Sequence, residues 1–367
     1  MSHDTAAPGL FDPISLRSLD LAHRGWVAAM CQYSCNVEGP PGVPTDWHLV
    51  HLGQFAIGGA ALIITEAAAV SHEGMISPRD AGIYTREQAD AWRRINDFIH
   101  RHSAVGTKTA VQLAHAGRKA STYWPFSGRR NSVPEADGGW QTLGPTDEAF
   151  GKYAAPRAMT EEDIAKVISD FGASAALAVE AGFDTMEIHA AHGYLLHQFL
   201  SPLVNTRTDG WGGSEEARFR LTLEVVREVR RAIPASMPLL LRISATDWTA
   251  GGLDAAVSAR LAKRAAEEGV DFIDVSTGGA VPTATIPVGP GYQVALAEDV
   301  RSSGVPTGAV GLISEPEQAD RIIREGRADV VLVARAALRD PHWWMRAAHE
   351  LGHDLSPAAQ YDRAGSY

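Results

Sequence analysis

Three side chains that handle protons stand within six positions of the chain. The segment HAAHGY supplies His189, His192 and Tyr194. A neutral imidazole can donate a hydrogen bond to a carbonyl oxygen, and a tyrosine hydroxyl can deliver a proton to a reacting carbon. A metal site is the competing interpretation, but no HExxH or CxxC motif accompanies the two histidines. We therefore interpret the three residues as catalytic, with structural packing as the alternative.

A second group of residues is suited to holding a phosphate. The segments TGAVG and VAR follow one another late in the chain and contain Val310, Gly311 and Arg335. Backbone amides and the fork of an arginine bind phosphomonoesters well. Arg242, in LLLRI, would add a permanent positive charge that can stabilise an anionic ring system, unless it only forms a structural ion pair.

Four further polar residues carry less information by themselves. Cys31 and Tyr33 lie in AAMCQY, whereas Gln112 and Lys119 lie in VQLAHAGRK. A buried cysteine is usually a small packing residue. These residues alone decide no chemistry.

The segments that must position these residues alternate between strand and helix patterns. A threonine at 160 with Asp163 three positions later predicts a capping box that opens one clear helix. LLLRI, apart from its arginine, and VVLVA are apolar rather than alternating, as in parallel strands covered on both faces. Short β-rich runs begin near residues 26, 61, 107, 184, 238, 271, 305 and 329. Eight strands in alternation with helices predict an α/β fold, a TIM (β/α)8 barrel, with the chemistry at the carboxyl ends of the strands.

One long connection interrupts this alternation. Residues 116–158 follow the third predicted strand and contain glycine, proline and several aromatic residues. Connections of this length are usually functional or disordered. We expect an inserted cap over the barrel mouth within a single domain that spans residues 1–367, with surface anchoring of the aromatics as the alternative.

Composition excludes several classes of function. Of the 367 residues, 45% are hydrophobic and 21% are charged, which is ordinary for a soluble globular protein. The 33 basic and 44 acidic residues give a net charge of −11, which disfavours a nucleic-acid partner. The two cysteines, Cys31 and Cys35, are too few for a disulfide framework or a four-thiolate metal site.

No membrane or export segment is expected. The longest apolar stretch, residues 56–70, is interrupted by Thr65 and Glu66 and is shorter than the roughly 20 residues of a spanning helix. The first ten residues lack a basic region followed by an apolar core. We therefore expect a cytoplasmic protein.

The combined motifs make the chain resemble the Old Yellow Enzyme family of NADH:flavin oxidoreductases. The cysteine of the first motif, the histidine pair and the QYDR tail resemble the bacterial ene-reductases grouped with xenobiotic reductase A. The resemblance covers nearly the whole chain in the right order. It rests on AAMCQYS, ITEAAAV, QLAHAGRK, EIHAAHGYLLHQFLSPLVNTRTDGWGGS, LRISATD, TGAVG and ARAALRDP.

The resemblance implies a noncovalently bound FMN over the barrel mouth. Gln112 would bond the pyrimidine edge of the flavin, Arg242 would face its N1/O2 side, and Cys31 would tune its redox potential. The matching cofactor positions are Ala28, Ala29, Met30, Cys31, Ala67, Gln112, Arg242, Val310, Gly311, Ala334 and Arg335.

The resemblance also implies the reaction. His189 and His192 would hold the carbonyl of an enone-type substrate, and hydride would pass from flavin N5 to its β-carbon. Tyr194 would protonate the α-carbon, and Tyr33 would line the substrate pocket. NADPH or NADH would reduce the flavin in a separate half-reaction, so that the cycle is ping-pong.

A residue of the C-terminal tail completes the expected site. Arg363, in the tail of residues 356–367, matches an arginine that reaches into a neighbouring subunit, which implies a homodimer or a higher homo-oligomer. A solvated tail arginine is the alternative.

The competing function is a flavin-free barrel lyase or isomerase that acts on a phosphorylated substrate.

Overall fold

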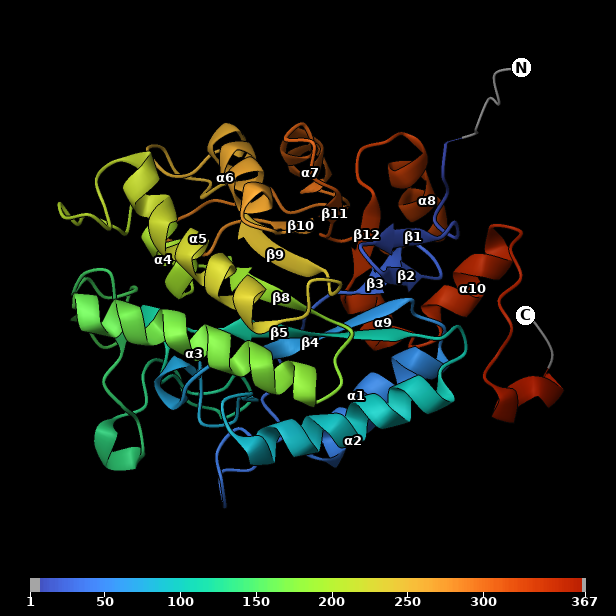
Figure 1. Ribbon diagram of the computed structural model, residues 1–367, viewed down its shortest axis with the longest axis horizontal. Helices are drawn as coiled ribbons and strands as arrows, with labels where there is room; N and C mark the ends of the chain where they lie inside the picture. The colour runs from blue at the N-terminus through green and yellow to red at the C-terminus, as the bar shows by residue number, and fades with distance from the viewer. Residues whose placement is uncertain (1–6, 365–367) are drawn as a thin grey trace.

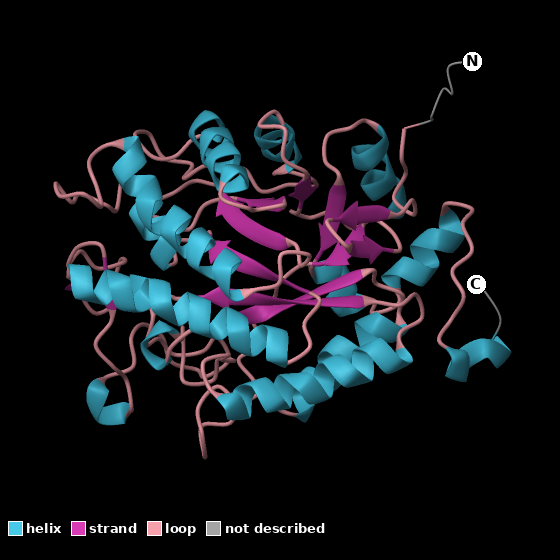
Figure 2. Ribbon diagram, in the orientation of Figure 1, coloured by secondary structure: helices cyan, strands magenta, loops and turns pink. Residues whose placement is uncertain are grey.

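Eight parallel strands close into a barrel that is surrounded by helices (Figures 1 and 2). The computed structural model describes residues 7–364, so residues 365–367 of the expected tail lie outside it. Strand β12 pairs with β3, which closes the barrel through Val331 and Gly25. The strands are β3 (Gly25–Val27), β4 (Leu62–Ala69), β5 (Lys108–Ala114), β8 (Thr185–Ala190), β9 (Leu239–Ser244), β10 (Phe272–Ser276), β11 (Thr307–Ala309) and β12 (Val330–Val333). The predicted TIM barrel is confirmed, with a strand at each of the eight expected places.

Helices between the strands form the outer layer, which Figure 1 shows around the barrel. The predicted capping box is present: the Asp163 amide donates to Thr160 Oγ1 at 3.2 Å, and the Thr160 amide donates to the Asp163 carboxylate at 2.8 Å. The helices are α1 (Asp46–Ile57), α2 (Arg86–His102), α3 (Glu161–Glu180), α4 (Leu195–Leu200), α5 (Glu215–Ala232), α6 (Ala255–Glu267), α7 (Val294–Arg301), α8 (Pro316–Arg324), α9 (Arg335–Arg339) and α10 (Trp343–Glu350).

The barrel interior is apolar at its amino end. Trp26 and Phe272 meet there with ring centroids 4.8 Å apart. A hairpin of β1 (Ile14–Leu16) and β2 (Leu19–Leu21) packs three leucines against the same cluster. This end is closed by apolar packing, so polar chemistry is left to the carboxyl ends of the strands.

The insert after β5 is folded, and it packs on loops at the carboxyl ends of other strands. It contains β6 (Leu143–Gly144), β7 (Arg157–Ala158) and two short 3-10 helices, Gly117–Lys119 and Glu135–Asp137. The Trp140 ring lies 4.8 Å from His72, in a third such helix (His72–Gly74) after β4, and Arg118 donates to the Ala280 carbonyl after β10. The insert therefore borders the barrel mouth, and its role as a cap stays a prediction.

The C-terminal tail lies at the opposite end of the barrel. Its last 3-10 helix, Ala359–Ala364, is docked where Gln360 meets His102 at 3.2 Å. His102 ends α2, which leads into the amino end of β5. Within residues 7–364, no helix combines the length and the hydropathy needed to cross a membrane.

Candidate active site

The turn after β8 brings the two histidines and the tyrosine together. His189 ends up with its ring centroid 5.1 Å from that of His192 and 5.2 Å from that of Tyr194. His192 and Gly193 have φ angles of 58° and 72°, left-handed values that fold the chain back so that Tyr194 returns over the strand end. His192 is held there by Ser276, whose Oγ lies 2.7 Å from its Nε2.

Burial sets the protonation of this group. Burial, aided by the positive charge of Arg242, lowers the pKa of His189 and of His192 well below the ordinary value. Burial also raises the pKa of Tyr194 well above its ordinary value. Both imidazoles are therefore neutral and the phenol keeps its proton at physiological pH. His189 Nδ1 is buried and has no hydrogen-bond partner among the described residues, so a ligand could use it.

Cys31 and Tyr33 reach the same place from the loop after β3. Together with Tyr194 they pack against a small cluster of Ile76, Ala116 and Ala120. Burial raises the pKa of the Cys31 thiol, so the sulfur stays protonated. Cys31 and Tyr33, whose types and positions in the sequence indicated no particular chemistry, thus line the mouth beside the histidine pair.

A buried glutamate braces that loop. Glu66 Oε2 accepts a hydrogen bond from the Gln32 amide at 3.0 Å, and its Oε1 lies 3.0 Å from His48 Nε2. The Thr45 amide donates to His48 Nδ1, which leaves Nε2 as the ring nitrogen that faces Glu66. Sequence reasoning missed this brace, although a glutamate inside the apolar run ITEAAAV was a usable signal.

Lys119 lies behind Tyr194, at the border with the insert. Its Nζ donates to the His192 carbonyl at 2.7 Å and lies 5.1 Å from the centre of the Tyr194 ring. Burial lowers the pKa of Lys119 to about 8. The ammonium group therefore adds positive potential close to the histidine pair.

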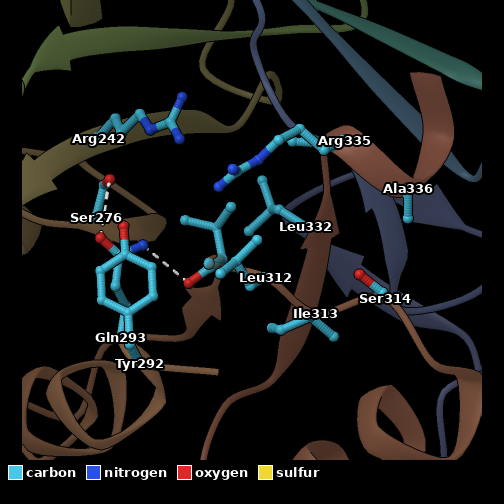
Figure 3. Close-up of a pocket in the computed structure, with 13 residues that line it drawn as sticks. Arg242, Ser276, Tyr292, Gln293, Leu312, Ile313, Ser314, Leu332, Arg335 and Ala336 are labelled. Carbon is cyan, nitrogen blue, oxygen red and sulfur yellow. Dashed lines mark hydrogen bonds between the residues drawn. The ribbon is translucent and has the colours of Figure 1, made fainter. Parts of the chain in front are cut away.

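A cavity of about 160 Å³ opens beside β11 and β12 (Figure 3). Gly311, at φ 122°, and Leu312, at φ 53°, form its floor in consecutive left-handed conformations. The backbone on either side of Gly311 is held by two hydrogen bonds, each of 2.9 Å. Gln293 donates to the Val310 carbonyl, and the Gly291 amide donates to the Gly311 carbonyl. No described residue accepts from the amides of Gly311 and Leu312, and such a pair of free amides is an anion-binding nest.

Two arginines face this cavity, one from strand β9 and one from the start of helix α9. Figure 3 shows Arg335, at the end of β12, extending toward the cavity, with Arg242 of β9 on another wall. Arg335 is exposed and has no ion pair with any residue of the described chain. Arg242 Nε lies 2.9 Å from Asp274 Oδ2, and its Nη1 donates to the Ala29 carbonyl at 3.4 Å. Arg242 is therefore both an ion-pair partner and a wall of the cavity.

Gln112 and Ala67 complete the predicted cofactor set on the other side of the mouth. They are direct neighbours across β4 and β5, beside an irregularity in the pairing of β4. The Gln112 side chain donates to Glu187 Oε1 at 2.7 Å. Its amide is thus held inside the barrel mouth.

The residues at the mouth fit an FMN group. Unused amides and an unpaired arginine suit its phosphate, while Arg242 and Gln112 offer charge and hydrogen bonds to a ring system. The orphaned Nδ1 of His189 points to a further ligand beside them. Among residues 7–364, no group of three or more His, Cys, Asp or Glu side chains could hold a metal ion.

Arg363 lies at the opposite end of its own barrel from this site, so its expected role in a neighbouring subunit stays a prediction. Several cavity residues were missed: Ser276, Tyr292, Gln293, Leu312, Ile313, Ser314, Leu332 and Ala336. Ser276 was detectable as a polar strand end, but Tyr292 and Gln293 reach the cavity only through tertiary packing.

Known proteins resemble this chain over nearly its full length. The model of the NADH:flavin oxidoreductase / NADH oxidase family matches residues 9–354. An NADPH dehydrogenase of Geobacillus sp. (strain WCH70) is 44% identical over 356 residues, which cover 96% of this chain and 98% of that protein.

Solved structures share the fold. Morphinone reductase superposes with a TM-score of 0.77 at 26% identity, covering 96% of this chain and 92% of that one. A homologue of old yellow enzyme from Zymomonas mobilis gives 0.77 at 25% identity, covering 95% and 94%. The flavin-free lyase or isomerase alternative receives no support from these comparisons.

Proposed function

Because the chain belongs to the NADH:flavin oxidoreductase / NADH oxidase family, and so is an FMN-dependent oxidoreductase that uses NAD(P)H, we propose that it reduces the activated C=C bond of α,β-unsaturated carbonyl compounds. One observation carries the proposal. The rings of neutral His192 and protonated Tyr194 each lie about 5 Å from that of neutral His189 at the barrel mouth, where a carbonyl oxygen and its α-carbon need different donors.

The histidine pair polarises the substrate. FMN, when bound, supplies the hydride that NAD(P)H provides. His189 and His192 donate hydrogen bonds to the carbonyl oxygen as negative charge develops there, and their neutral state avoids the cost of burying a charge before the substrate arrives. Ser276 keeps His192 in place, so little reorganisation is needed during the reaction.

Tyr194 delivers the proton. Its hydroxyl keeps its hydrogen because burial disfavours the phenolate, and it lies against His189, which holds the same substrate. Proximity, more than acidity, makes it the donor to the α-carbon. Tyr33 and Cys31 line the same pocket.

Two groups of residues on different sides of the mouth hold the cofactor. The amides of Gly311 and Leu312 and the guanidinium of Arg335 take the phosphate, and Arg242 and Gln112 take the polar edge of the ring. Ala28, Ala29, Met30, Ala67, Val310 and Ala334 supply the remaining contacts.

Replacing Arg335 by alanine is expected to weaken FMN binding about tenfold to a hundredfold, because a hydrogen-bonded charge is lost, worth about 1.5–3 kcal/mol. Fluorescence titration of the apoprotein with FMN measures this. Riboflavin, which lacks the phosphate, should bind both proteins equally, and Arg339→Ala, an exposed arginine of the same helix, should change neither ligand. An equal loss of riboflavin binding would contradict a phosphate role.

The visible spectrum of the purified protein tests the proposed function. Under anaerobic conditions NADPH should bleach the flavin absorption, and 2-cyclohexenone should then restore it. No flavin after reconstitution with FMN would overturn the assignment. Bleaching without recovery on the enone would keep the flavin and transfer the search to other electron-poor acceptors, such as nitro compounds or quinones.

His189→Ala tests the carbonyl site without turnover. A phenol mimics the substrate oxygen, and its long-wavelength charge-transfer band with the flavin should weaken, with the dissociation constant raised at least tenfold because a buried hydrogen bond is lost. Tyr84→Phe, a tyrosine outside the His189 cluster, is the control. An unchanged band would remove His189 from ligand recognition.

Arg363 completes the proposal as a residue that acts on a second copy of the chain in a homodimer. The tail that carries it is exposed and far from its own mouth, so any contact with a substrate must be made in another subunit. Arg363→Ala is expected to raise KM for the enone with little change in the rate of flavin reduction by NADPH. Mixing it with Tyr194→Phe should restore part of the lost activity through hybrid dimers; no restoration would contradict action in trans.

A further inference from the structure

A layer of polar side chains lies inside the barrel, between its apolar amino end and the mouth. Four neighbouring strands supply Gln112 from β5, Glu187 from β8, Arg242 from β9 and Asp274 from β10. Glu187 and Asp274 are completely buried, and the other two are at most 6% exposed. Buried carboxyl groups of this kind need partners, and none of the proposed catalytic steps uses Glu187 or Asp274.

The hydrogen bonds of this layer are incomplete unless a proton is added. Glu187 Oε2 and both carboxyl oxygens of Asp274 have no donor among the described side chains. Arg242 Nε lies 2.9 Å from Asp274 Oδ2, but the alignment is that of an ion pair and not of a directional hydrogen bond, since both atoms remain without one. A single hydrogen between the two carboxyl groups satisfies one oxygen on each.

Glu187 and Asp274 lie in the same buried layer, close enough for the ionisation of one to affect the other. Burial, followed by the negative charge of Asp274, raises the pKa of Glu187 to about 8. Glu187 is therefore the protonated member at neutral pH. One negative charge then remains on the pair and balances the one positive charge of Arg242.

This protonation also orients the amide of Gln112. The Gln112 Nε2 group donates to Glu187 Oε1 at 2.7 Å, which serves as the carbonyl oxygen of a protonated carboxyl group. Glu187 Oε2 then donates toward Asp274. In this order the shared hydrogen has an acceptor, and the side-chain carbonyl oxygen of Gln112 is left available to the mouth.

We propose that Glu187 and Asp274 share one proton and act as a positioning pair. The pair orients the Gln112 side chain and sets the net charge next to Arg242. It thereby sets the ratio of the affinities of the site for reduced and for oxidised FMN. The inference rests on the FMN site proposed above. Neither residue touches the substrate, so both are positioning residues.

The redox potential of the bound flavin tests the pair, because its difference from free FMN gives the ratio of the two affinities. Glu187→Gln retains an acceptor for Gln112 and a donor for Asp274, so the ratio should change less than twofold. The double variant Glu187→Gln/Asp274→Asn removes the balancing charge without leaving a second carboxyl group that could ionise in its place, and it should raise the affinity ratio for the anionic reduced form at least tenfold, or about 29.6 mV for a two-electron couple. Asp184→Asn, at the amino end of β8, controls for distant charge and should have no effect.

The opposite results are equally informative. If Glu187→Gln alone raised the ratio as much as the double variant does, Glu187 would be ionised and the shared proton would be disproved. An unchanged ratio in the double variant would show that the pair does not act on the flavin.

Infrared spectroscopy provides a readout that is independent of the flavin. The difference spectrum of wild type minus Glu187→Gln at neutral pH should contain the carbonyl band of a protonated carboxyl group, and its absence would overturn the inference. A protein that binds no FMN would defeat the proposed function, whereas the infrared band would still decide whether the proton is shared.

Discussion

Replacing Tyr194 by phenylalanine is expected to slow enone reduction roughly 10²–10⁴-fold, the range that a positioned general acid contributes. The substitution removes one hydroxyl and leaves the ring that packs against His189. Reduction of the flavin by NADPH needs no proton from this residue and should keep its rate. Stopped-flow measurement of the two half-reactions separates these effects.

Tyr33→Phe is the matched control for that experiment. Tyr33 is a second phenol in the same cluster, packed with Cys31 and Tyr194, and burial also raises its pKa. We expect its loss to change KM for the enone more than the rate of the oxidative half-reaction. If Tyr33→Phe stopped that half-reaction while Tyr194→Phe did not, the two residues would have to exchange roles.

Gly193→Ala is expected to abolish most of the enone activity while FMN remains bound. Gly193 has a φ of 72°, and an added Cβ would collide with the carbonyl oxygen of Gly279 in the loop after β10. Because this obstacle is a backbone atom, the turn must shift, and His192 and Tyr194 shift with it. A displacement of about 1 Å at such a site can cost 10²-fold in rate.

Gly106→Ala provides the comparison for Gly193→Ala. Gly106 has nearly the same φ, 71°, and a Cβ there would meet nothing within 4 Å. Gly106→Ala should lower the free energy of unfolding by only about 1–2 kcal/mol, the cost of a left-handed conformation for a residue with a Cβ, and it should leave the activity intact. Chemical denaturation and steady-state assays of both variants measure the two effects. Equal losses of activity would attribute the Gly193 effect to general destabilisation.

The barrel was predictable because its signals are local. Apart from Arg242, runs such as LLLRI and VVLVA are apolar, and the strands that they form are buried at every position, since a parallel strand in a barrel is covered on both faces. The Thr160 capping box is likewise complete within four residues. The insert could be located but its course could not, because it is held by distant partners such as Ala280 and His72.

The candidate site was predictable where one segment carries several of its groups. His189, His192 and Tyr194 come from a single turn, and the nest residue Gly311 lies in TGAVG. Leu312 was missed because a leucine seldom adopts a positive φ, and only the surrounding backbone imposes it. Gln293 was missed because its partners, Thr277 and the Val310 carbonyl, follow two different strands.

The sequence by itself determined the alternation of eight strands with helices, the end of the barrel where chemistry occurs, and the residue types found there. These follow from hydrophobic patterning and from short motifs, which depend only on neighbours along the chain. Only the tertiary structure decided that both histidines are neutral, that Glu187 meets Asp274 beside Arg242, and that Arg363 lies far from its own site. Protonation and charge balance depend on burial and on groups from different strands, and these exist only once the barrel has closed.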